Sequence, residues 1–250
     1  MPTVQSGGVP ISWDDVGSAD GRPVLLVHGF ASNGAQNWRR AGWDTALHEA
    51  GLRGIVVDLR GHGNSGRPPG AEHYRHELFL ADLVAVLEAL HLDRVGYLGY
   101  SFGARLGWDL AIAHPRRIGP LVLGGFASDS PLTDFDLDAA RTATFRGTAI
   151  THPPTAALMR MAALVPGNDL SRLMDVVEGI RADALPPLRH GAAPATPTCI
   201  VNGERDTIAA GGDALARAIG AEYVSLPARS HTSAVSSRRF KEAATAWLKR

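Results

Sequence analysis

The stretch LGYSFGAR, Leu98–Arg105, decides the fold of this 250-residue chain. It continues the apolar run RVGYL and leads into a segment with helical spacing, and Gly99 and Gly103 bracket Ser101 in a Gly-x-Ser-x-Gly pattern. Only a sharp turn fits between a strand that ends here and a helix that begins here, and glycines on both sides keep side chains away from neighbouring backbone. The Ser101 hydroxyl is therefore predicted to project from the sheet beside free helix N–H groups, a place suited to a nucleophile.

Short apolar runs bounded by glycine or proline alternate with helical patterns on both sides of this stretch. Such alternation predicts an α/β protein with a parallel sheet. The predicted strands, each buried on both faces, are 23–29, 54–61, 94–101, 119–126, 196–203 and 221–228. The predicted helices around them are 76–92, 103–114 and 238–250.

The interval 125–197 departs from this alternation of strands and helices, because it is much longer than a usual connection between strands. It carries three helical patterns, 136–147, 153–165 and 169–185, rather than the composition of a flexible linker. It therefore looks like an inserted cap.

Composition and charge limit the partners and the cellular compartment that we expect for this protein. Lys+Arg and Asp+Glu both number 25, and no basic stripe appears, so we expect no nucleic-acid partner. No apolar run approaches the ~18 residues of a membrane span, and we expect no membrane partner. The single cysteine, Cys199, lies in an apolar stretch and is predicted to be a small buried side chain. These features favour a soluble, cytoplasmic protein, and they do not specify an oligomeric state.

Five motifs resemble the α/β-hydrolase family: HGF at 28–30, DLRGHGNS at 58–65, GYSFG at 99–103, VNGERD at 201–206 and ARSH at 228–231. The resemblance runs from the strand at 23–29 to the C-terminal helix and is interrupted by the variable interval. It implies a mostly parallel, doubly wound sheet. The core would comprise residues 1–124 and 198–250, with a small helical cap, residues 125–197, inserted after the sixth strand.

A serine nucleophile needs a base and an orienting acid. The resemblance implies His231 as the base and Asp206 as the acid, in the chain order Ser, Asp, His of this fold. Asp129 is the competing acid, because some relatives place the carboxylate after the strand at 119–126. Asp58 and Arg60 are expected to tie neighbouring turns in a structural loop.

Acyl chemistry also needs N–H donors for a developing oxyanion. The sharp turn at Ser101, called the elbow below, supplies the backbone N–H of Phe102. The resemblance implies the N–H of Phe30 as the second donor. The histidines outside ARSH show no metal-site spacing, so we expect no metal and no cofactor. The predicted pocket residues are Phe30, Tyr100, Phe102, Leu158, Met159 and Met161.

Ser101 at the elbow argues against haloalkane dehalogenases and soluble epoxide hydrolases, which resemble the chain elsewhere but use aspartate there. Carboxylesterase, lactonase, thioesterase, carbon–carbon bond hydrolase and cofactor-free perhydrolase-like activities stay open. The most economical hypothesis is cleavage of a small to medium, mostly apolar carboxylic ester or lactone through an acyl-enzyme on Ser101. A non-hydrolytic lyase or cyclase using the same pocket, and a ligand-binding receptor that retains the triad, are the alternatives from other classes.

Overall fold

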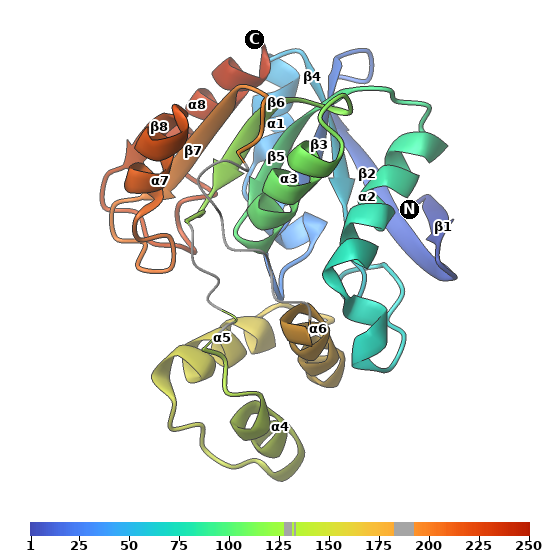
Figure 1. Ribbon diagram of the computed structural model, residues 1–250, viewed down its shortest axis with the longest axis vertical. Coiled ribbons are helices and arrows are strands. Elements are labelled where there is room, and N and C mark those ends of the chain that lie inside the picture. The colour runs from blue at the N-terminus through green and yellow to red at the C-terminus, as the bar shows by residue number, and fades with distance from the viewer. Residues whose placement is uncertain (128–131, 133, 183–192) are drawn as a thin grey trace.

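A single sheet organises the protein (Figure 1), whose computed structural model describes residues 1–127, 132, 134–182 and 193–250. In these residues the sheet has eight strands in the order β1-β2-β4-β3-β5-β6-β7-β8. β1, β2 and β4 pair antiparallel, and the other neighbours pair parallel. The strands are β1 (Thr3–Ser6), β2 (Val9–Gly17), β3 (Arg22–Val27), β4 (Leu52–Val57), β5 (Val95–Tyr100), β6 (Ile118–Gly124), β7 (Thr198–Gly203) and β8 (Glu222–Leu226).

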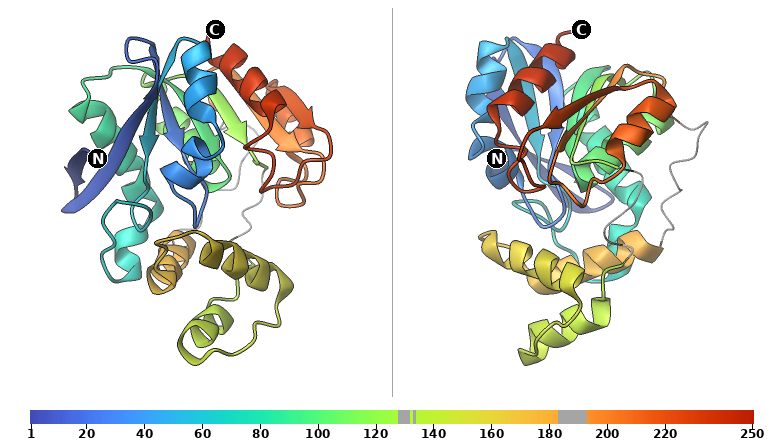
Figure 2. Two further views of the ribbon diagram at one scale, coloured as in Figure 1. Left: turned by 180° about the vertical axis from the view of Figure 1, so that it is seen from behind. Right: turned by 90° about the vertical axis from the view of Figure 1, so that its left-hand side faces the viewer.

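Helices cover both faces of the sheet (Figure 2). α1 and α8 pack on one face, and α2, α3 and α7 pack on the other. Among the described residues, no helix is both long enough and apolar enough to cross a membrane. The helices are α1 (Trp43–Glu49), α2 (His76–Ala89), α3 (Phe102–Ala113), α4 (Leu137–Arg146), α5 (Pro153–Leu164), α6 (Leu170–Ala182), α7 (Gly212–Ile219) and α8 (Arg238–Leu248), with short helical turns η1 (Ala35–Arg39) and η2 (Ala71–Tyr74).

The central strands are buried on both faces, as their continuous apolar runs predict. In β3, Val24 and Leu26 join the core under α1 and α8, while Leu25 and Val27 join the core on the opposite face. The same prediction is wrong for β8, in which only Leu226 is buried. β8 is an edge strand, and its faces are only partly covered.

The C-terminal helix α8 forms as its apolar spacing predicts. Phe240, Ala244, Trp247 and Leu248 are its buried residues and face the sheet. Ser237 begins the helix, because its side chain accepts a hydrogen bond from the backbone N–H of Phe240 at 3.1 Å. Cys199 is buried as predicted, and burial raises the pKa of its thiol to about 12.

Three helices, α4, α5 and α6, lie between β6 and β7 and stand apart from the sheet at one of its ends (Figure 1). They match the three helical patterns of the sequence, although residues 183–185 of the third pattern lie outside the described residues. We propose that residues 125–197 form a cap on a core of residues 1–124 and 198–250.

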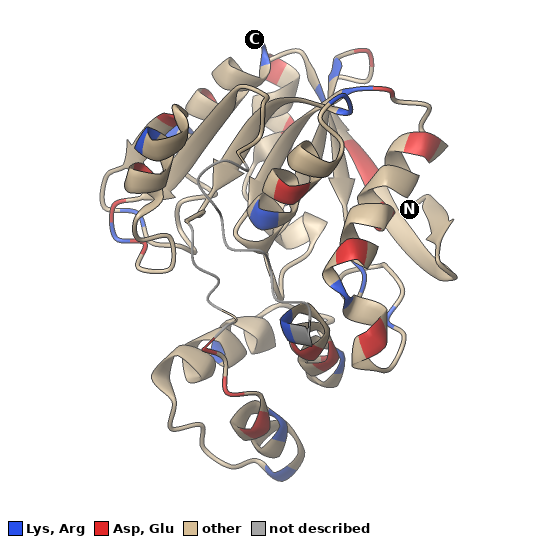
Figure 3. Ribbon diagram, viewed as in Figure 1, with Lys and Arg blue, Asp and Glu red and all other residues tan. Residues whose placement is uncertain are grey.

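α6 is tied closely to the body of the protein through η2. A Cβ on Gly179 would lie 2.4 Å from the carbonyl oxygen of Ala71, so only glycine permits this approach. Asp175 of α6 accepts a hydrogen bond from the Gly70 N–H at 3.1 Å. The same carboxylate pairs with Arg172 at 2.6 Å, and acidic and basic residues are interspersed on α4 and α6 (Figure 3). Arg141 and Arg172 therefore serve ion pairs within these three helices.

The N-terminal hairpin of β1 and β2 is absent from the sequence-based strands. Its turn is Gly7–Gly8, and both glycines have positive φ, 56° and 80°. A Gly-Gly pair between two short strands is a recognised hairpin signal, because both central turn positions need positive φ. The sequence therefore contained the information for this element.

Candidate active site

Ser101 occupies the sharp turn that the Gly-x-Ser-x-Gly pattern predicts. β5 ends at Tyr100 and α3 begins at Phe102, so Ser101 alone connects them. Its φ of 53° and ψ of −114° lie in a region that residues with a side chain rarely adopt. The strained backbone projects the side chain away from the strand and places it beside the free N–H groups of the α3 N-terminus.

Both glycines of the motif are required by close backbone approaches. A Cβ on Gly99 would lie 2.3 Å from the carbonyl oxygen of Gly103. A Cβ on Gly103 would lie 2.2 Å from the carbonyl oxygen of Val27, at the end of β3. Any side chain would therefore push α3 away from the strands on which Ser101 depends.

Gly103→Ala is expected to lower the free energy of unfolding by about 1–3 kcal/mol or more, because the added methyl group meets rigid backbone. Gly96→Ala is a matched control in β5, where the new Cβ would meet the flexible end of Leu248 at 3.1 Å. Urea unfolding measures both. Equal losses in the two variants would refute the steric role assigned to Gly103.

His231 and Asp206 form the hydrogen-bonded pair expected of a base and its orienting acid. His231 Nδ1–H donates to Asp206 Oδ2 at 2.8 Å, and the Asp206 side chain is fully buried. Asp206 Oδ1 accepts backbone N–H bonds from Ile208 at 3.1 Å and Ala209 at 3.0 Å, which fix the carboxylate. The competing acid Asp129 lies outside the described residues.

Tyr100 and Gly125 contact His231 and position its ring. The Tyr100 hydroxyl donates to the backbone carbonyl of His231 at 2.5 Å, and the two rings lie 5.3 Å apart. A Cβ on Gly125 would come within 2.9 Å of His231 Cε1, so the absence of a side chain there makes room for the imidazole. The loop after β8 is thereby held over the carboxyl ends of the strands.

Ser101 and His231 line one cavity, although the described residues show no hydrogen bond between Ser101 Oγ and His231 Nε2. Catalytic hydrogen bonds of this kind are often long without a ligand and tighten when substrate binds. The catalytic roles of Ser101, His231 and Asp206 therefore stay a prediction.

The HGF loop lies directly against the serine turn. A Cβ on Gly29 would meet Ser101 Cβ at 3.2 Å, which places the loop beside the predicted nucleophile. Within the described residues, neither the Phe30 nor the Phe102 backbone N–H donates a hydrogen bond. Both side chains line the cavity. The assignment of their N–H groups to an oxyanion stays a prediction.

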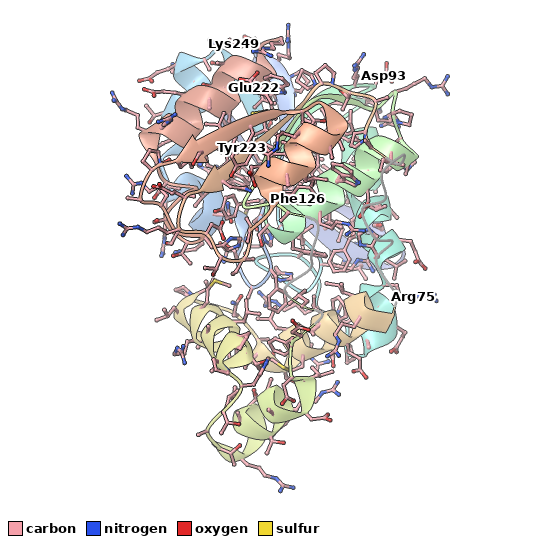
Figure 4. The ribbon with its side chains drawn as sticks, turned by 60° about the vertical axis from the view of Figure 1, so that its left-hand side comes forward. Arg75, Asp93, Phe126, Glu222, Tyr223 and Lys249 are labelled. Carbon is pink, nitrogen blue, oxygen red and sulfur yellow. The ribbon has the colours of Figure 1, made fainter. Side chains whose placement is uncertain are left out.

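The cavity has a volume of about 280 Å³ and lies between the body and α5. Apolar side chains dominate its wall, and five of the six predicted pocket residues are among them: Phe30, Tyr100, Phe102, Leu158 and Met161. Met159 is the exception and packs into the adjoining core. Its side chain points away because successive helix residues are rotated by about 100°. Phe126, labelled in Figure 4, adds a further aromatic side chain from the body.

Sequence reasoning missed several polar residues of the cavity wall, among them Asn37 and Arg105. Asn37 is buried and accepts a hydrogen bond from the Gly29 N–H at 3.4 Å. Arg105, one turn after Ser101 on α3, donates to Asp109 Oδ2 at 2.6 Å. The position of Arg105 four residues after Ser101 is a signal, because residues at that spacing share a helix face.

His28 and His62 hold loops together rather than perform chemistry. His28 Nε2 accepts from the Leu59 N–H and His62 Nε2 from the Ala31 N–H, both at 3.1 Å. Each Nδ1–H donates to a backbone carbonyl, so both rings are neutral. Burial lowers the pKa of both imidazoles, that of His62 to about 3.

The DLRGHGNS segment is structural, as predicted. Asp58 accepts backbone hydrogen bonds from Gly34 at 2.7 Å and Asn64 at 2.8 Å. Arg60 forms a buried, two-pronged ion pair with Asp82 of α2, at 2.5 and 2.6 Å. These bonds fix the loops behind the cavity.

Comparison with known proteins agrees with this architecture. A family model described as the alpha/beta hydrolase fold matches residues 22–165. The crystal structure of the enol-lactonase from Burkholderia xenovorans aligns over 100% of both chains, with a TM-score of 0.78 at 23% identity. The structure of an N-acyl homoserine lactone degrading enzyme covers 99% of this chain and 100% of its own, with a TM-score of 0.75 at 25% identity.

A curated relative is similar in sequence over part of its length. The 2-hydroxy-6-oxo-2,4-heptadienoate hydrolase of Pseudomonas putida is 42% identical over 139 residues, which are 54% of this chain and 48% of that protein. This chain thus matches about half the length of that relative.

Proposed function

The chain belongs to the α/β-hydrolase family, and we propose that it is a serine hydrolase of small to medium, mostly apolar carboxylic esters or lactones. One observation carries the proposal: Ser101, on its strained turn, lines the same apolar cavity as His231, which is bonded to the buried Asp206. A family member with serine at the elbow has the nucleophile that acyl transfer requires.

In the proposed first step, Ser101 Oγ attacks the substrate carbonyl carbon and its proton passes to His231 Nε2. Asp206 accepts the Nδ1–H of His231, which leaves Nε2 as the basic nitrogen and stabilises the imidazolium. The new oxyanion accepts hydrogen bonds from the N–H groups of Phe30 and Phe102. When the tetrahedral intermediate collapses, the leaving alkoxide takes the proton from His231 and the acyl group stays on Ser101.

Water then attacks the acyl-enzyme, again with His231 as base, and releases the acid together with free Ser101. In a lactone the alcohol remains part of the acyl group, so the single product is a hydroxy acid. The same residues thus serve both substrate classes.

The shape and polarity of the cavity support this substrate class. Its volume of about 280 Å³ is near the lower end of ligand sites, which suits short and medium acyl groups. Leu158, Met161 and Val165 contribute an apolar wall from the α5 side. The structural relative named as a lactone-degrading enzyme supports the lactone arm of the proposal.

Carbon–carbon bond hydrolysis is the second candidate, favoured by the Pseudomonas putida relative. A dienoate substrate of the kind in that name carries a carboxylate. Arg105 in the cavity wall is the charged side chain that such a group would meet. The two candidates share Ser101, His231 and Asp206 and differ in the bond that breaks.

Labelling with a fluorophosphonate probe, followed by kinetics on ester, lactone and dienoate panels, tests the proposal. We expect stoichiometric labelling of Ser101 and values of kcat/KM that are highest for short and medium acyl chains. A kcat/KM that rises steadily to long-chain esters would contradict the inferred cavity. A preference of about 100-fold or more for the dienoate would favour the second candidate.

A further inference from the structure

The residues Gly29–Ser32 form a tight turn beside Ser101, and Phe30 within this turn lines the cavity. The Ser32 N–H donates to the Gly29 carbonyl at 3.2 Å, and Ala31 occupies the third position with a φ of 58°. A positive φ at this position is typical of a type II turn, in which glycine is preferred. Alanine is strained in this conformation, so surrounding contacts must hold the turn.

Two side chains hold the backbone of Ala31 from opposite sides. His62, from the body, accepts the Ala31 N–H at 3.1 Å. Asn168, which lies between α5 and α6, donates through Nδ2 to the Ala31 carbonyl at 2.8 Å. The second hydrogen of the same amide group bonds the Ala162 carbonyl of α5 at 2.9 Å. Asn168 therefore links the helix that lines the cavity to the turn.

These bonds occupy the polar groups of the turn that face away from the substrate. The Gly29 carbonyl accepts from Ser32 and also from His28 Nδ1 at 2.8 Å. Within the described residues, the Phe30 N–H makes no hydrogen bond of its own. Hydrogen bonds thus hold Gly29, Ala31 and Ser32, while the Phe30 N–H is left without a partner in the described residues.

We propose that Asn168 is a positioning residue that keeps the Phe30 N–H aimed at the oxyanion by holding Ala31 in its positive-φ conformation. The inference rests on the proposed acyl-transfer function. It assigns to the cap a part in transition-state stabilisation as well as in substrate shape. Without Asn168 the Ala31 carbonyl loses its partner and the strained turn can relax, which moves the donor.

Asn168→Ala is expected to lower kcat for a short nitrophenyl ester by about 10- to 100-fold, a part of the effect of losing an oxyanion donor, with KM nearly unchanged. A boronic acid, which forms a tetrahedral adduct on the serine, should bind more weakly by a similar factor. An effect confined to KM would contradict the proposal, because it would indicate a role in substrate binding alone.

Asp175→Ala is the matched control, because it also removes a bond between the cap and the body but does not touch the turn. Its thermal stability should fall to a similar extent, while kcat stays near wild type. Ala31→Gly should rescue the Asn168→Ala variant, because glycine adopts positive φ without strain. It should restore a large part of kcat in the Asn168→Ala background, and a failure of this rescue would overturn the role assigned to the strain.

Amide hydrogen exchange over residues 29–32 provides a readout that does not depend on turnover. Exchange should rise by about tenfold or more in Asn168→Ala and stay unchanged in Asp175→Ala. Equal exchange in wild type and Asn168→Ala would overturn the proposal even in an active enzyme. If exchange rises in Asn168→Ala as expected but the wild-type protein neither reacts with fluorophosphonate nor cleaves any ester, the result would contradict the proposed function alone.

Discussion

Ser101→Ala is expected to lower ester turnover by about 10⁴- to 10⁶-fold, and His231→Ala by a similar factor. In the proposed mechanism the serine supplies the attacking oxygen and the imidazole supplies the base, so neither acts without the other. The double variant should be little worse than either single variant. Steady-state and single-turnover kinetics on a nitrophenyl ester measure all three.

Ser18→Ala and His152→Ala are controls for this experiment, because both residues lie outside the cavity wall. Their rates should stay near wild type. Losses that multiply in the double variant would show that Ser101 and His231 do not act as one unit. Retention of substantial turnover by Ser101→Ala would remove the acyl-enzyme from the mechanism.

The second large effect is on stability in acid. His28 and His62 are buried with neutral rings, and burial is the main reason why their pKa values are lowered, that of His62 from 6.5 to about 3. In the unfolded chain both rings take up a proton near pH 6.5, whereas the folded protein resists this. The folded protein is therefore most stable above about pH 6.5 and loses stability as the pH falls below it, and for His62 this loss continues down to about pH 3.

Urea unfolding between pH 7 and pH 4 should show a free energy of unfolding that falls by up to about 1.4 kcal/mol per pH unit for each histidine. His62→Gln keeps an acceptor for the Ala31 N–H but does not titrate, so it should reduce the slope. His114→Gln replaces an exposed histidine and should leave the slope unchanged. An identical slope in wild type and His62→Gln would refute the assignment.

Much of the fold could be predicted because its signals are local. The apolar runs of β3 to β7 and the spacing of Phe240, Ala244 and Trp247 in α8 depend on residues close together in the chain. The turn at Ser101 was also predictable, because Gly99 and Gly103 mark positions where neighbouring backbone comes too close for any side chain. The predicted burial of β8 was wrong, because exposure at a sheet edge depends on what packs nearby.

The site was predictable only in part, for a physical reason. His231 and Asp206 stand next to strand ends, where the fold itself brings them together. The bond between Asn168 and Ala31 joins residues 137 positions apart, and no local pattern marks it. Met159 was misplaced because its orientation depends on the exact rotation of α5, which composition does not determine.

The position of α4, α5 and α6 between β6 and β7 has a consequence for biosynthesis. A nascent chain that has left the ribosome as far as β6 carries Ser101 and the Gly29–Ser32 turn, but it lacks Asp206 and His231. The edge of β6 that pairs with β7 stays unpaired until all three helices have been translated. An unpaired strand edge in an incomplete chain favours aggregation. The proposed triad can therefore assemble only after the segment that carries Asp206 and His231 has emerged and docked.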